Sequence, residues 1–317
     1  MKNIFIIGIT GFIGQHLSRE LIKSGIYSIK GLTRNNHDLL SQQSENIKYI
    51  QGDILLPMEF ISHIDPGSIV INLAYLKNQT IEKNLQATRN LVDICISKKI
   101  ERLIHCSTAV VSGRVKNNII TEQIKCYPGN EYEKTKYQIE QVLIEKTCNH
   151  LPLTILRPTA VFGENGQNLL KLANEIKRGN YFLIHLKSYL YNNRKMNLVA
   201  IENVVAALKF LISFEQSAKK EVFIISDDDD ENNHYQYIKT FLSLRLNSNH
   251  SNLPIIKFPM LFLSILQRLF KKSSINPLQI FSSQKIFQAG FQKRITLDTA
   301  LEKFVEWYQT KEIKSPL

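Results

Sequence analysis

Short apolar runs alternate with amphipathic stretches through the first half of the chain. The runs at residues 3–7, 28–32, 47–51, 69–73, 102–106 and 153–156 predict buried strands, because they are rich in Ile, Val and Leu. Between them, residues 13–24 and 81–97 are predicted helices. In the second helix, Leu85, Leu91, Val92 and Cys95 fall near one face. Strands separated by helices of this length predict a parallel sheet with right-handed crossovers, a doubly wound α/β fold.

After Arg157-Pro158 this alternation becomes less regular. Residues 164–196 and 227–290 are richer in loops, aromatic side chains and basic side chains. Between these stretches, residues 196–212 predict the end of a strand followed by a helix, and residues 221–226 predict another strand.

A glycine-rich turn, within the sequence GITGFIGQHL, follows the first predicted strand. Strand, turn and helix in this order are the setting in which such glycines bind a dinucleotide. Gly8 permits a tight turn, Gly11 lets the backbone approach a pyrophosphate, and Gly14 lets the helix pack closely on the sheet. The helix N-terminus offers free N–H groups to the diphosphate. The predicted dinucleotide contacts of this turn are Gly8, Thr10, Gly11, Phe12, Ile13 and Gly14.

The end of the second predicted strand discriminates between the two nicotinamide dinucleotides. An NAD-binding chain usually places Asp or Glu there to bind the ribose hydroxyls. Here Arg34 lies 20 residues after Gly14, and no acid occurs before Asp38. An arginine can pair with a 2′-phosphate in bidentate fashion. The sequence therefore predicts NADP as the cofactor, with NAD as the alternative.

A tyrosine and a lysine lie four residues apart at Tyr132 and Lys136. On a helix this spacing puts both side chains on one face, one turn apart. A free phenol titrates at pH ~10, and a nearby ammonium lowers that value, so the pair can exchange a proton with a substrate oxygen. Tyr137 fails as a candidate for this pair because residue 141, four positions later, is Gln.

The glycine turn, the triplet Cys106-Ser107-Thr108 and the pair Tyr132 and Lys136 follow one another at a characteristic spacing. Together they resemble the extended short-chain dehydrogenase/reductase superfamily, in its NAD-dependent epimerase/dehydratase branch. The resemblance covers roughly residues 1–226. It implies a Rossmann domain at 1–163 plus 197–226 and a smaller, discontinuous substrate-binding region at 164–196 plus 227–317. It also implies a small-molecule substrate, a nucleotide sugar, and assembly as a homodimer.

The same resemblance implies roles for further residues. The family pattern S-[ST]-x-x-V-Y-G is similar to STAVVSG here, which places Thr108 at the catalytic hydroxyl with Ser107 beside it. Tyr132 becomes the general acid or base, and Lys136 also binds the nicotinamide ribose. The further cofactor contacts that it implies are Asp53 at the adenine, Ile54, Leu73 and Ala74. Polar residues in the variable region where relatives bind a nucleotide diphosphate are Asn168, Lys187, Arg194 and Lys195; the predicted substrate contacts are Ser107, Asn168 and Arg194.

The composition narrows the class of protein. The net charge of +12 would suit nucleic-acid binding, but the basic residues are dispersed and an acidic run occupies residues 227–231. Nucleic acid is therefore not a predicted partner. Four cysteines without C-x-x-C pairing or metal-type spacing predict a reduced, cytoplasmic protein without a metal site. The start of the chain does not resemble a signal peptide. The apolar stretch 258–270 contains polar interruptions and is shorter than the ~20 residues that span a bilayer, so no transmembrane segment is predicted.

The segment after Thr108 bears on the reaction type. Sugar-nucleotide dehydratases of this family carry an Asp-Glu pair there, whereas this chain has Ala109 and Val110. The leading hypothesis is therefore an NADP-dependent reductase of a keto group on a nucleotide-activated sugar, such as a 4-keto-6-deoxyhexose. The alternatives are a nucleotide-sugar 4-epimerase that retains NAD, a reductase of hydroxysteroid-like or dihydroflavonol-like ketones, and a non-enzymatic NADP sensor. Such sensors usually lose the Tyr or the Lys, which this chain keeps.

Overall fold

The computed structural model describes residues 1–34, 46–148, 150–178, 184, 187–188, 193–215, 220–246 and 276–314. The chain divides into two compact units. The first comprises Met1–Gly113, Pro128–Pro158 and Val204–Phe223, and the second comprises Arg114–Tyr127, Thr159–Asn203 and Ile224–Leu317. The domain limits expected from the sequence separate a dinucleotide-binding part from a substrate-binding part. They stay a prediction.

A seven-stranded parallel sheet forms the centre of the first unit, which confirms the predicted doubly wound α/β fold. The strands are β1 (Lys2–Ile7), β2 (Tyr27–Thr33), β3 (Ile47–Gln51), β4 (Ile69–Asn72), β5 (Arg102–Cys106), β7 (Leu153–Pro158) and β10 (Lys220–Ile225). Their order is β10-β7-β5-β4-β1-β2-β3, so the order of strands reverses between β1 and β4. Ile7 pairs with Leu32 on one side and with Asn72 on the other. In sheets of this kind, ligands bind at such a reversal, beyond the carboxyl ends of the strands.

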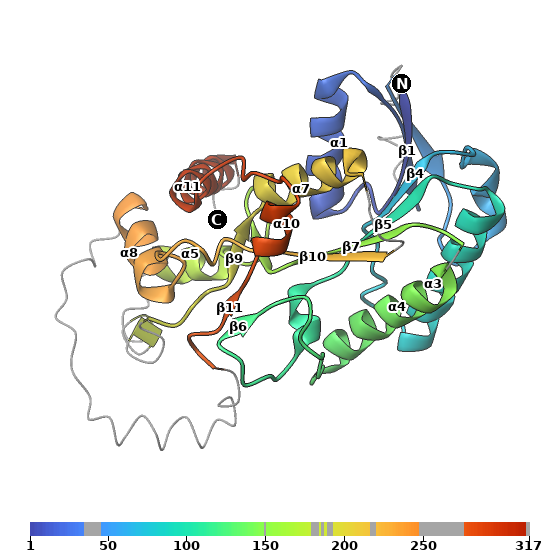
Figure 1. Cartoon of the computed structure of the whole chain (residues 1–317). Coiled ribbons are helices and arrows are strands. Elements are labelled where there is room, and N and C mark those ends of the chain that lie inside the picture. Colours follow the sequence, from blue (N-terminus) through green and yellow to red (C-terminus); the bar gives the residue numbers. More distant parts are fainter. Residues whose placement is uncertain are drawn as a thin grey trace. The chain divides into compact units, whose positions relative to one another are not determined.

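Helices cover both faces of this sheet, with α1 on one face and α3 and α4 on the other (Figure 1). The helices of this unit are α1 (Phe12–Ser24), α3 (Ile81–Ser97), α4 (Glu131–Thr147) and most of α7 (Ile201–Ser213), with 3-10 turns at η1 (Pro57–Glu59), η2 (Ile61–His63) and η3 (Ala109–Ser112). The start of α4 is fixed by a capping box, in which Asn130 accepts a hydrogen bond from the Glu133 N–H at 2.9 Å.

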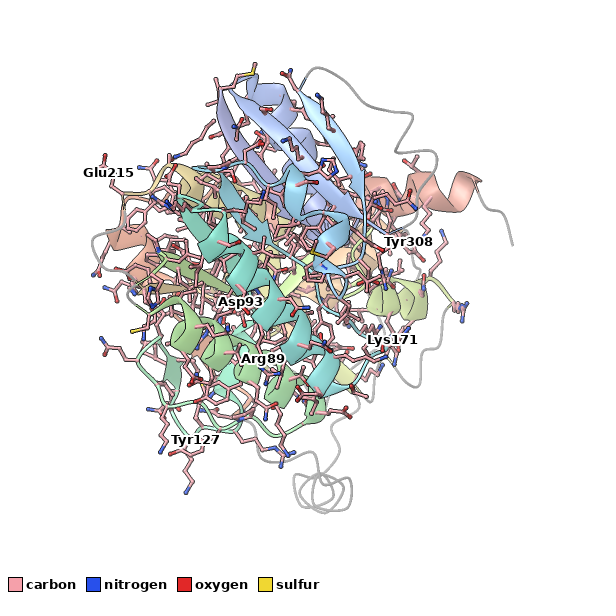
Figure 2. All side chains as sticks on the ribbon, turned by 90° about the vertical axis from the view of Figure 1, so that its right-hand side faces the viewer. Arg89, Asp93, Tyr127, Lys171, Glu215 and Tyr308 are labelled. Atoms are coloured by element: carbon pink, nitrogen blue, oxygen red, sulfur yellow. The ribbon has the colours of Figure 1, made fainter. Side chains whose placement is uncertain are left out.

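The two helices α3 and α4 pack side by side over one hydrophobic core. Leu91 of α3 and Leu143 of α4 are fully buried there, together with Leu103 of β5. Figure 2 shows Asp93 on α3, and its carboxylate lies 2.8 Å from Lys146 Nζ of α4. The helix that carries the predicted tyrosine and lysine is therefore held on the sheet by a neighbouring helix.

The second unit contains two small parallel sheets, one of β6 with β11 and one of β8 with β9. Its described elements are β6 (Ile119–Ile120), β8 (Ala160–Phe162), α5 (Leu170–Lys177), β9 (Leu198–Ala200), α8 (Tyr235–Arg245), β11 (Ile280–Phe281), α10 (Gln284–Gln288) and α11 (Leu297–Lys314). Phe162, Leu242 and Phe304 lie in the core that joins β8, α8 and α11.

The acidic run at residues 227–231 begins with two buried carboxylates of the second unit. Asp227 is 1% exposed and accepts a hydrogen bond from Asn203 Nδ2 at 3.0 Å, while Lys293 Nζ lies 3.0 Å from the same oxygen. Burial raises the pKa of Asp228 to about 6. The first two residues of the run therefore have a structural role, and Asn203 is one of the hydrogen-bond donors to them.

Two features singled out in the sequence belong to parts of the chain that the structure does not describe. The apolar stretch 258–270 and Asp38 lie outside the described residues. Among the helices that the structure describes, none is both long and apolar enough to cross a membrane.

Candidate active site

Glycine is required at two positions where β1 leads into α1, one in the turn and one in the first turn of the helix. Gly8 has φ +84°, and a Cβ on it would lie 3.0 Å from the backbone N of Ala74. A Cβ on Gly14 would lie 2.3 Å from the Gly8 carbonyl oxygen. Gly8 therefore lets the loops after β1 and β4 approach closely, and Gly14 lets α1 start directly against the turn.

The N-terminus of α1 is suited to an anion. Gly11 is the N-cap and supplies no side-chain acceptor, and the first turn contains no acidic residue. The first-turn N–H groups of Phe12 and Ile13 therefore belong to a positive helix end without a competing carboxylate. Thr10 precedes the cap, and its carbonyl oxygen accepts a hydrogen bond from Gln15 Nε2 at 3.0 Å. This donor set fits the diphosphate of a dinucleotide.

The remaining predicted cofactor residues follow β2, β3 and β4. Arg34 is exposed directly after β2. Asp53 Oδ1 accepts a hydrogen bond from the Leu55 N–H at 2.9 Å, so this carboxylate also shapes its own turn. Ile54 is buried in the core under α3 and α4. Leu73 donates its N–H to the Ile7 carbonyl at 2.9 Å, which places the loop after β4 beside the glycine turn.

The three predicted catalytic side chains come together within the first unit. Thr108 is the N-cap of η3 just after β5 and is buried, and its hydroxyl lies near enough to the Tyr132 phenol to lower the pKa of that phenol. Lys136 follows one helical turn after Tyr132, and its Nζ donates to the Cys106 carbonyl at 3.1 Å. Tyr132 remains 42% exposed, whereas Lys136 is 4% exposed. A hydroxyl, an accessible phenol and a buried ammonium thus meet where β5 ends.

The pKa of Tyr132 is raised, which is the opposite of the direction expected from the sequence. Burial is the largest cause, and the Cys106 thiol adds to the rise, while the nearby Thr108 hydroxyl opposes it. The Lys136 ammonium is directed at a backbone carbonyl, and burial lowers the pKa of its amine. The phenol therefore stays protonated at neutral pH.

Ser107 carries an unsatisfied polar atom at this site. Its side chain is 5% exposed, and its Oγ has no hydrogen-bond partner among the described residues. A buried hydroxyl without a partner is costly. A ligand oxygen reaching this position could satisfy it, in keeping with the predicted substrate contact.

A buried ion pair fixes α4 on the sheet, and the sequence analysis did not identify it. Arg157 of β7 donates from Nε to Glu140 Oε1 at 3.0 Å and from Nη2 to Oε2. Glu140 is completely buried and lies one turn after Lys136. Its negative charge favours the protonated form of Lys136. The signal available in the sequence was a carboxylate within the apolar face of a helix, between Ile139 and Leu143.

The cysteines contribute no nucleophile to this site. Burial raises the pKa of the Cys106 thiol to about 11, so a thiolate does not form there at neutral pH. Cys95 is buried as well, and none of the four cysteines forms a disulfide. The described residues contain no group of three or more His, Cys, Asp or Glu that could hold a metal ion.

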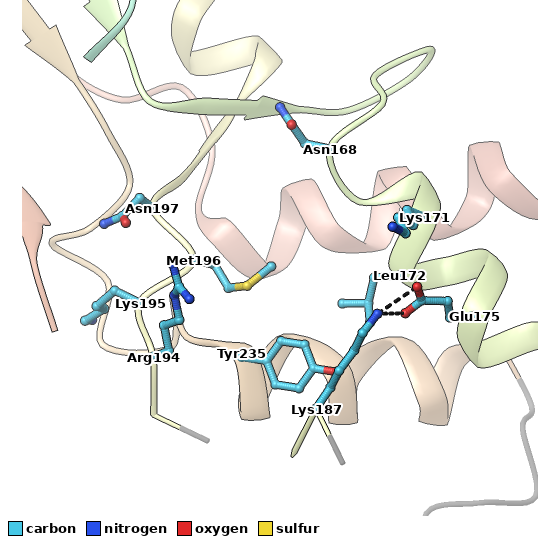
Figure 3. Close-up of a pocket in the computed structure, with 10 residues that line it drawn as sticks. All are labelled: Asn168, Lys171, Leu172, Glu175, Lys187, Arg194, Lys195, Met196, Asn197 and Tyr235. Atoms are coloured by element: carbon cyan, nitrogen blue, oxygen red, sulfur yellow. Dashed lines mark hydrogen bonds and ion pairs between the residues drawn. The ribbon is translucent and has the colours of Figure 1, made fainter. Parts of the chain in front are cut away.

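A basic pocket lies in the second unit (Figure 3). Its volume is about 430 Å³, and all four polar residues singled out from the variable region line it. Lys187 Nζ is held by Glu175 at 2.6 and 2.7 Å, and Lys195 Nζ donates to two backbone carbonyls at 3.3 Å. The residues that line the pocket are Asn168, Lys171, Leu172, Glu175, Lys187, Arg194, Lys195, Met196, Asn197 and Tyr235. Four basic side chains against one carboxylate fit an anionic ligand.

Residues 4–226 match the model of the NAD dependent epimerase/dehydratase family. The chain belongs to this family. It is accordingly an enzyme of the extended short-chain dehydrogenase type, in a family of NAD-linked epimerases and dehydratases of nucleotide sugars.

Relatives match the chain along nearly its whole length. An Escherichia coli O157:H7 protein, N-acetyl-alpha-D-glucosaminyl-diphospho-ditrans,octacis-undecaprenol 4-epimerase, is 25% identical over 332 residues, which cover 96% of this chain and 95% of that protein. The UDP-glucose 4-epimerase of Thermotoga maritima, solved with UDP-glucose, has a TM-score of 0.73 at 18% identity, covering 98% and 99% of the two chains. Bordetella bronchiseptica WbmH, solved with NAD+, has a TM-score of 0.75 at 16% identity, with the same coverage. The two solved structures show the shared fold.

Proposed function

We propose that this chain is an NADPH-dependent reductase of a keto group on a nucleotide-activated sugar, such as a 4-keto-6-deoxyhexose. The observation that carries the proposal is the Tyr132 phenol, which lies near the Thr108 hydroxyl and one helical turn before the buried Lys136. The raised pKa of Tyr132 favours reduction, because a proton donor must hold its proton at working pH. Ala109 and Val110, in place of an acid pair, speak against dehydration.

In this proposal each side chain has one task. Thr108 donates a hydrogen bond to the substrate carbonyl oxygen, and Ser107 supports the same oxygen. Tyr132 Oη gives that oxygen its proton. Bound at the glycine turn, the nicotinamide supplies the hydride. The Lys136 ammonium then stabilises the phenolate that Tyr132 has become, and it binds the nicotinamide ribose.

The dinucleotide is held by the residues that follow β1 to β4. The proposed contacts in the glycine turn are those of Gly8, Thr10, Gly11, Phe12, Ile13 and Gly14 with the diphosphate. Asp53 and Ile54 contact the adenine, and Leu73 and Ala74 lie under the ribose. Arg34, exposed directly after β2, pairs with a 2′-phosphate. These contacts favour NADP over the NAD bound by solved relatives such as WbmH.

The basic pocket of the second unit is the proposed site of the substrate diphosphate. Arg194 and Lys195 supply charge, and Asn168 supplies an amide that is anchored through Nδ2 to the Val161 carbonyl at 2.6 Å. In this proposal the dinucleotide domain is 1–163 plus 197–226, and the substrate region is 164–196 plus 227–317. A homodimer in the cytoplasm is part of the same proposal.

The proposal is tested by following NADPH absorbance with the purified protein and a UDP- or dTDP-linked 4-keto-6-deoxyhexose. Reduction is expected with NADPH, and a lower kcat/KM is expected with NADH. Absence of turnover on every nucleotide-linked keto sugar at saturating NADPH would contradict the proposal.

A 4-epimerase is the second candidate, because a 4-epimerase aligns with this chain over 96% of its length. An epimerase returns its hydride within each cycle and therefore retains its dinucleotide. Mass spectrometry of the purified protein separates the two functions. Tightly held NAD with interconversion of two C4-epimeric sugar nucleotides, without added cofactor, supports the epimerase. Exchangeable NADPH supports the reductase.

A further inference from the structure

Tyr75 lies beside both members of the proposed acid–base pair. It follows β4 in the segment Asn72-Leu73-Ala74-Tyr75, and it has no role in the chemistry proposed above. Its backbone is fixed from both sides. Ala74 donates its N–H to Asn72 Oδ1 at 3.1 Å, and the next residue, Leu76, donates its N–H to Asn84 Oδ1 at 3.0 Å.

The ring of Tyr75 contacts both the Tyr132 ring and the Lys136 ammonium. The centroid of the Tyr132 ring lies 5.2 Å from that of Tyr75, and the planes meet at 86°, an edge-to-face arrangement. Lys136 Nζ lies 5.5 Å from the centroid of the same Tyr75 ring. The edge-to-face contact restricts the Tyr132 ring, and the π face attracts the ammonium.

The ammonium of Lys136 needs such support. The side chain is 4% exposed, and its described hydrogen bond goes to the Cys106 carbonyl. An ammonium has three donors, so one carbonyl satisfies it only in part. A cation over an aromatic face gains more when it is desolvated than when it is exposed.

We propose that Tyr75 is a positioning residue that holds the Tyr132 ring in place and keeps Lys136 charged through its aromatic face. The inference rests on the proposed function only for the roles of Tyr132 and Lys136. The contacts themselves belong to the first unit and do not depend on which sugar is the substrate.

Other titratable groups face this pair and bear on the design of a test. From β5, the Cys106 thiol interacts electrostatically with both Tyr132 and Lys136, and the neutral His105 is close enough to Lys136 for its pKa to be lowered by that charge. From α4 itself, Glu140 favours the charge of Lys136, and Glu131 interacts with Tyr75. All of these groups stay unchanged in Tyr75 variants.

The test compares Tyr75→Phe, which keeps the ring, with Tyr75→Leu, which removes it. The matched control is Tyr127→Leu, because Tyr127 also lies under a cation, Lys125, at 5.6 Å, but is exposed. The first readout is the pKa of Lys136, measured by NMR titration of ¹³Cε-lysine protein and assigned with Lys136→Met. The second is the pH profile of kcat for NADPH-dependent reduction.

In Tyr75→Leu the pKa of Lys136 is expected to fall by about one unit, and kcat by about tenfold, with the alkaline limb of the profile moving to lower pH. Tyr75→Phe and Tyr127→Leu are expected to stay within about twofold of the wild type in kcat. Unchanged Lys136 titration and kcat in a folded Tyr75→Leu protein would overturn the inference. Equal losses in Phe and Leu would overturn it too, because they would assign the effect to the hydroxyl.

Two further measurements keep the outcome clear. If Tyr75→Leu does not fold, Tyr75→Met keeps an apolar side chain of similar length without an aromatic face, and the same results are expected from it. The NMR titration needs no substrate. A protein without reductase activity whose Lys136 titration responds to Tyr75→Leu would refute the proposed function and leave the contact between Tyr75 and Lys136 standing.

Discussion

Lys136 Nζ donates a hydrogen bond to the carbonyl oxygen of Cys106 at 3.1 Å, which joins the middle of α4 to the end of β5. Because Thr108 follows two residues after Cys106 and Tyr132 precedes Lys136 by one turn, this bond also sets the separation between the hydroxyl and the phenol. Burial lowers the pKa of Lys136, and the nearby Cys106 and Glu140 groups oppose that fall. The site therefore holds a cation at a place where desolvation works against its charge.

Replacement of Lys136 should strongly lower activity and leave stability nearly unchanged. In Lys136→Met, kcat is expected to fall by about 10²- to 10⁴-fold, because the charge that supports proton transfer is lost. The free energy of unfolding should change by no more than about 1 kcal/mol, since one hydrogen bond is lost together with the cost of burying an ammonium. Initial rates and urea denaturation measure the two effects. The control is Lys134→Met, at an exposed position of the same helix, which should change neither kcat nor the free energy of unfolding.

The phenol is tested by removing one oxygen. Tyr132→Phe should lose about 10²- to 10⁴-fold in kcat, because the proton donor is gone. Its Tm should be close to that of the wild type, since the ring is 42% exposed and keeps its edge-to-face contact with Tyr75. Tyr137→Phe, on the same helix, is the matched control. Comparable losses in the two variants would contradict the assignment of Tyr132.

The buried ion pair of Glu140 and Arg157 should be required for stability. Glu140→Gln keeps the shape of the side chain but leaves the Arg157 guanidinium buried against an uncharged amide. Breaking such a pair is expected to lower the free energy of unfolding by about 3–5 kcal/mol, measured by urea denaturation. Glu145→Gln, at an exposed position of α4, should change it by less than about 0.5 kcal/mol. A loss of similar size in the control would point to a general effect of charge on α4.

Local patterns in the sequence were enough to predict the central sheet. The predicted strand 47–51 coincides with β3, and the predicted helix 81–97 coincides with α3. Runs of Ile and Val covered on both faces carry this information in their own residues. The contacts of Tyr75, Glu140 and Asp227 could not be predicted in the same way, because each depends on a partner from a distant element. The raised pKa of Tyr132 has the same origin, since burial is a property of the packed structure and not of the Y-x-x-x-K spacing.

Arg34 should determine which dinucleotide binds. In Arg34→Ala the Kd for NADPH is expected to rise by about 10- to 100-fold, as for the loss of charge-assisted hydrogen bonds to a phosphate, while the Kd for NADH stays nearly unchanged. Fluorescence titration of the stripped protein measures both. Lys23→Ala, which removes an exposed cation near the end of α1, controls for the general effect of positive charge. Equal weakening of NADPH and NADH would exclude a contact with the 2′-phosphate.

His105 should make the stability of the protein depend on pH. Its ring is completely buried on β5, and both ring nitrogens lack hydrogen-bond partners among the described residues. Burial and, to a smaller extent, the charge of Lys136 hold the pKa of His105 well below its usual 6.5. The folded protein therefore keeps this ring neutral, whereas the unfolded chain binds a proton below its own pKa. Stability is fully present above pH ~6.5 and is lost as the pH falls below that value.

The variant His105→Leu removes this linkage. Between about pH 7.5 and about pH 5.5, the wild type should lose about 1.4 kcal/mol more free energy of unfolding than the variant. At the higher pH the variant should be at least as stable as the wild type, because an apolar side chain replaces a buried polar ring without partners. Urea denaturation at the two pH values gives the difference directly, and His63→Leu, which removes an exposed histidine, is the control. The same pH dependence in wild type and His105→Leu would show that His105 is protonated or hydrogen-bonded in the folded protein.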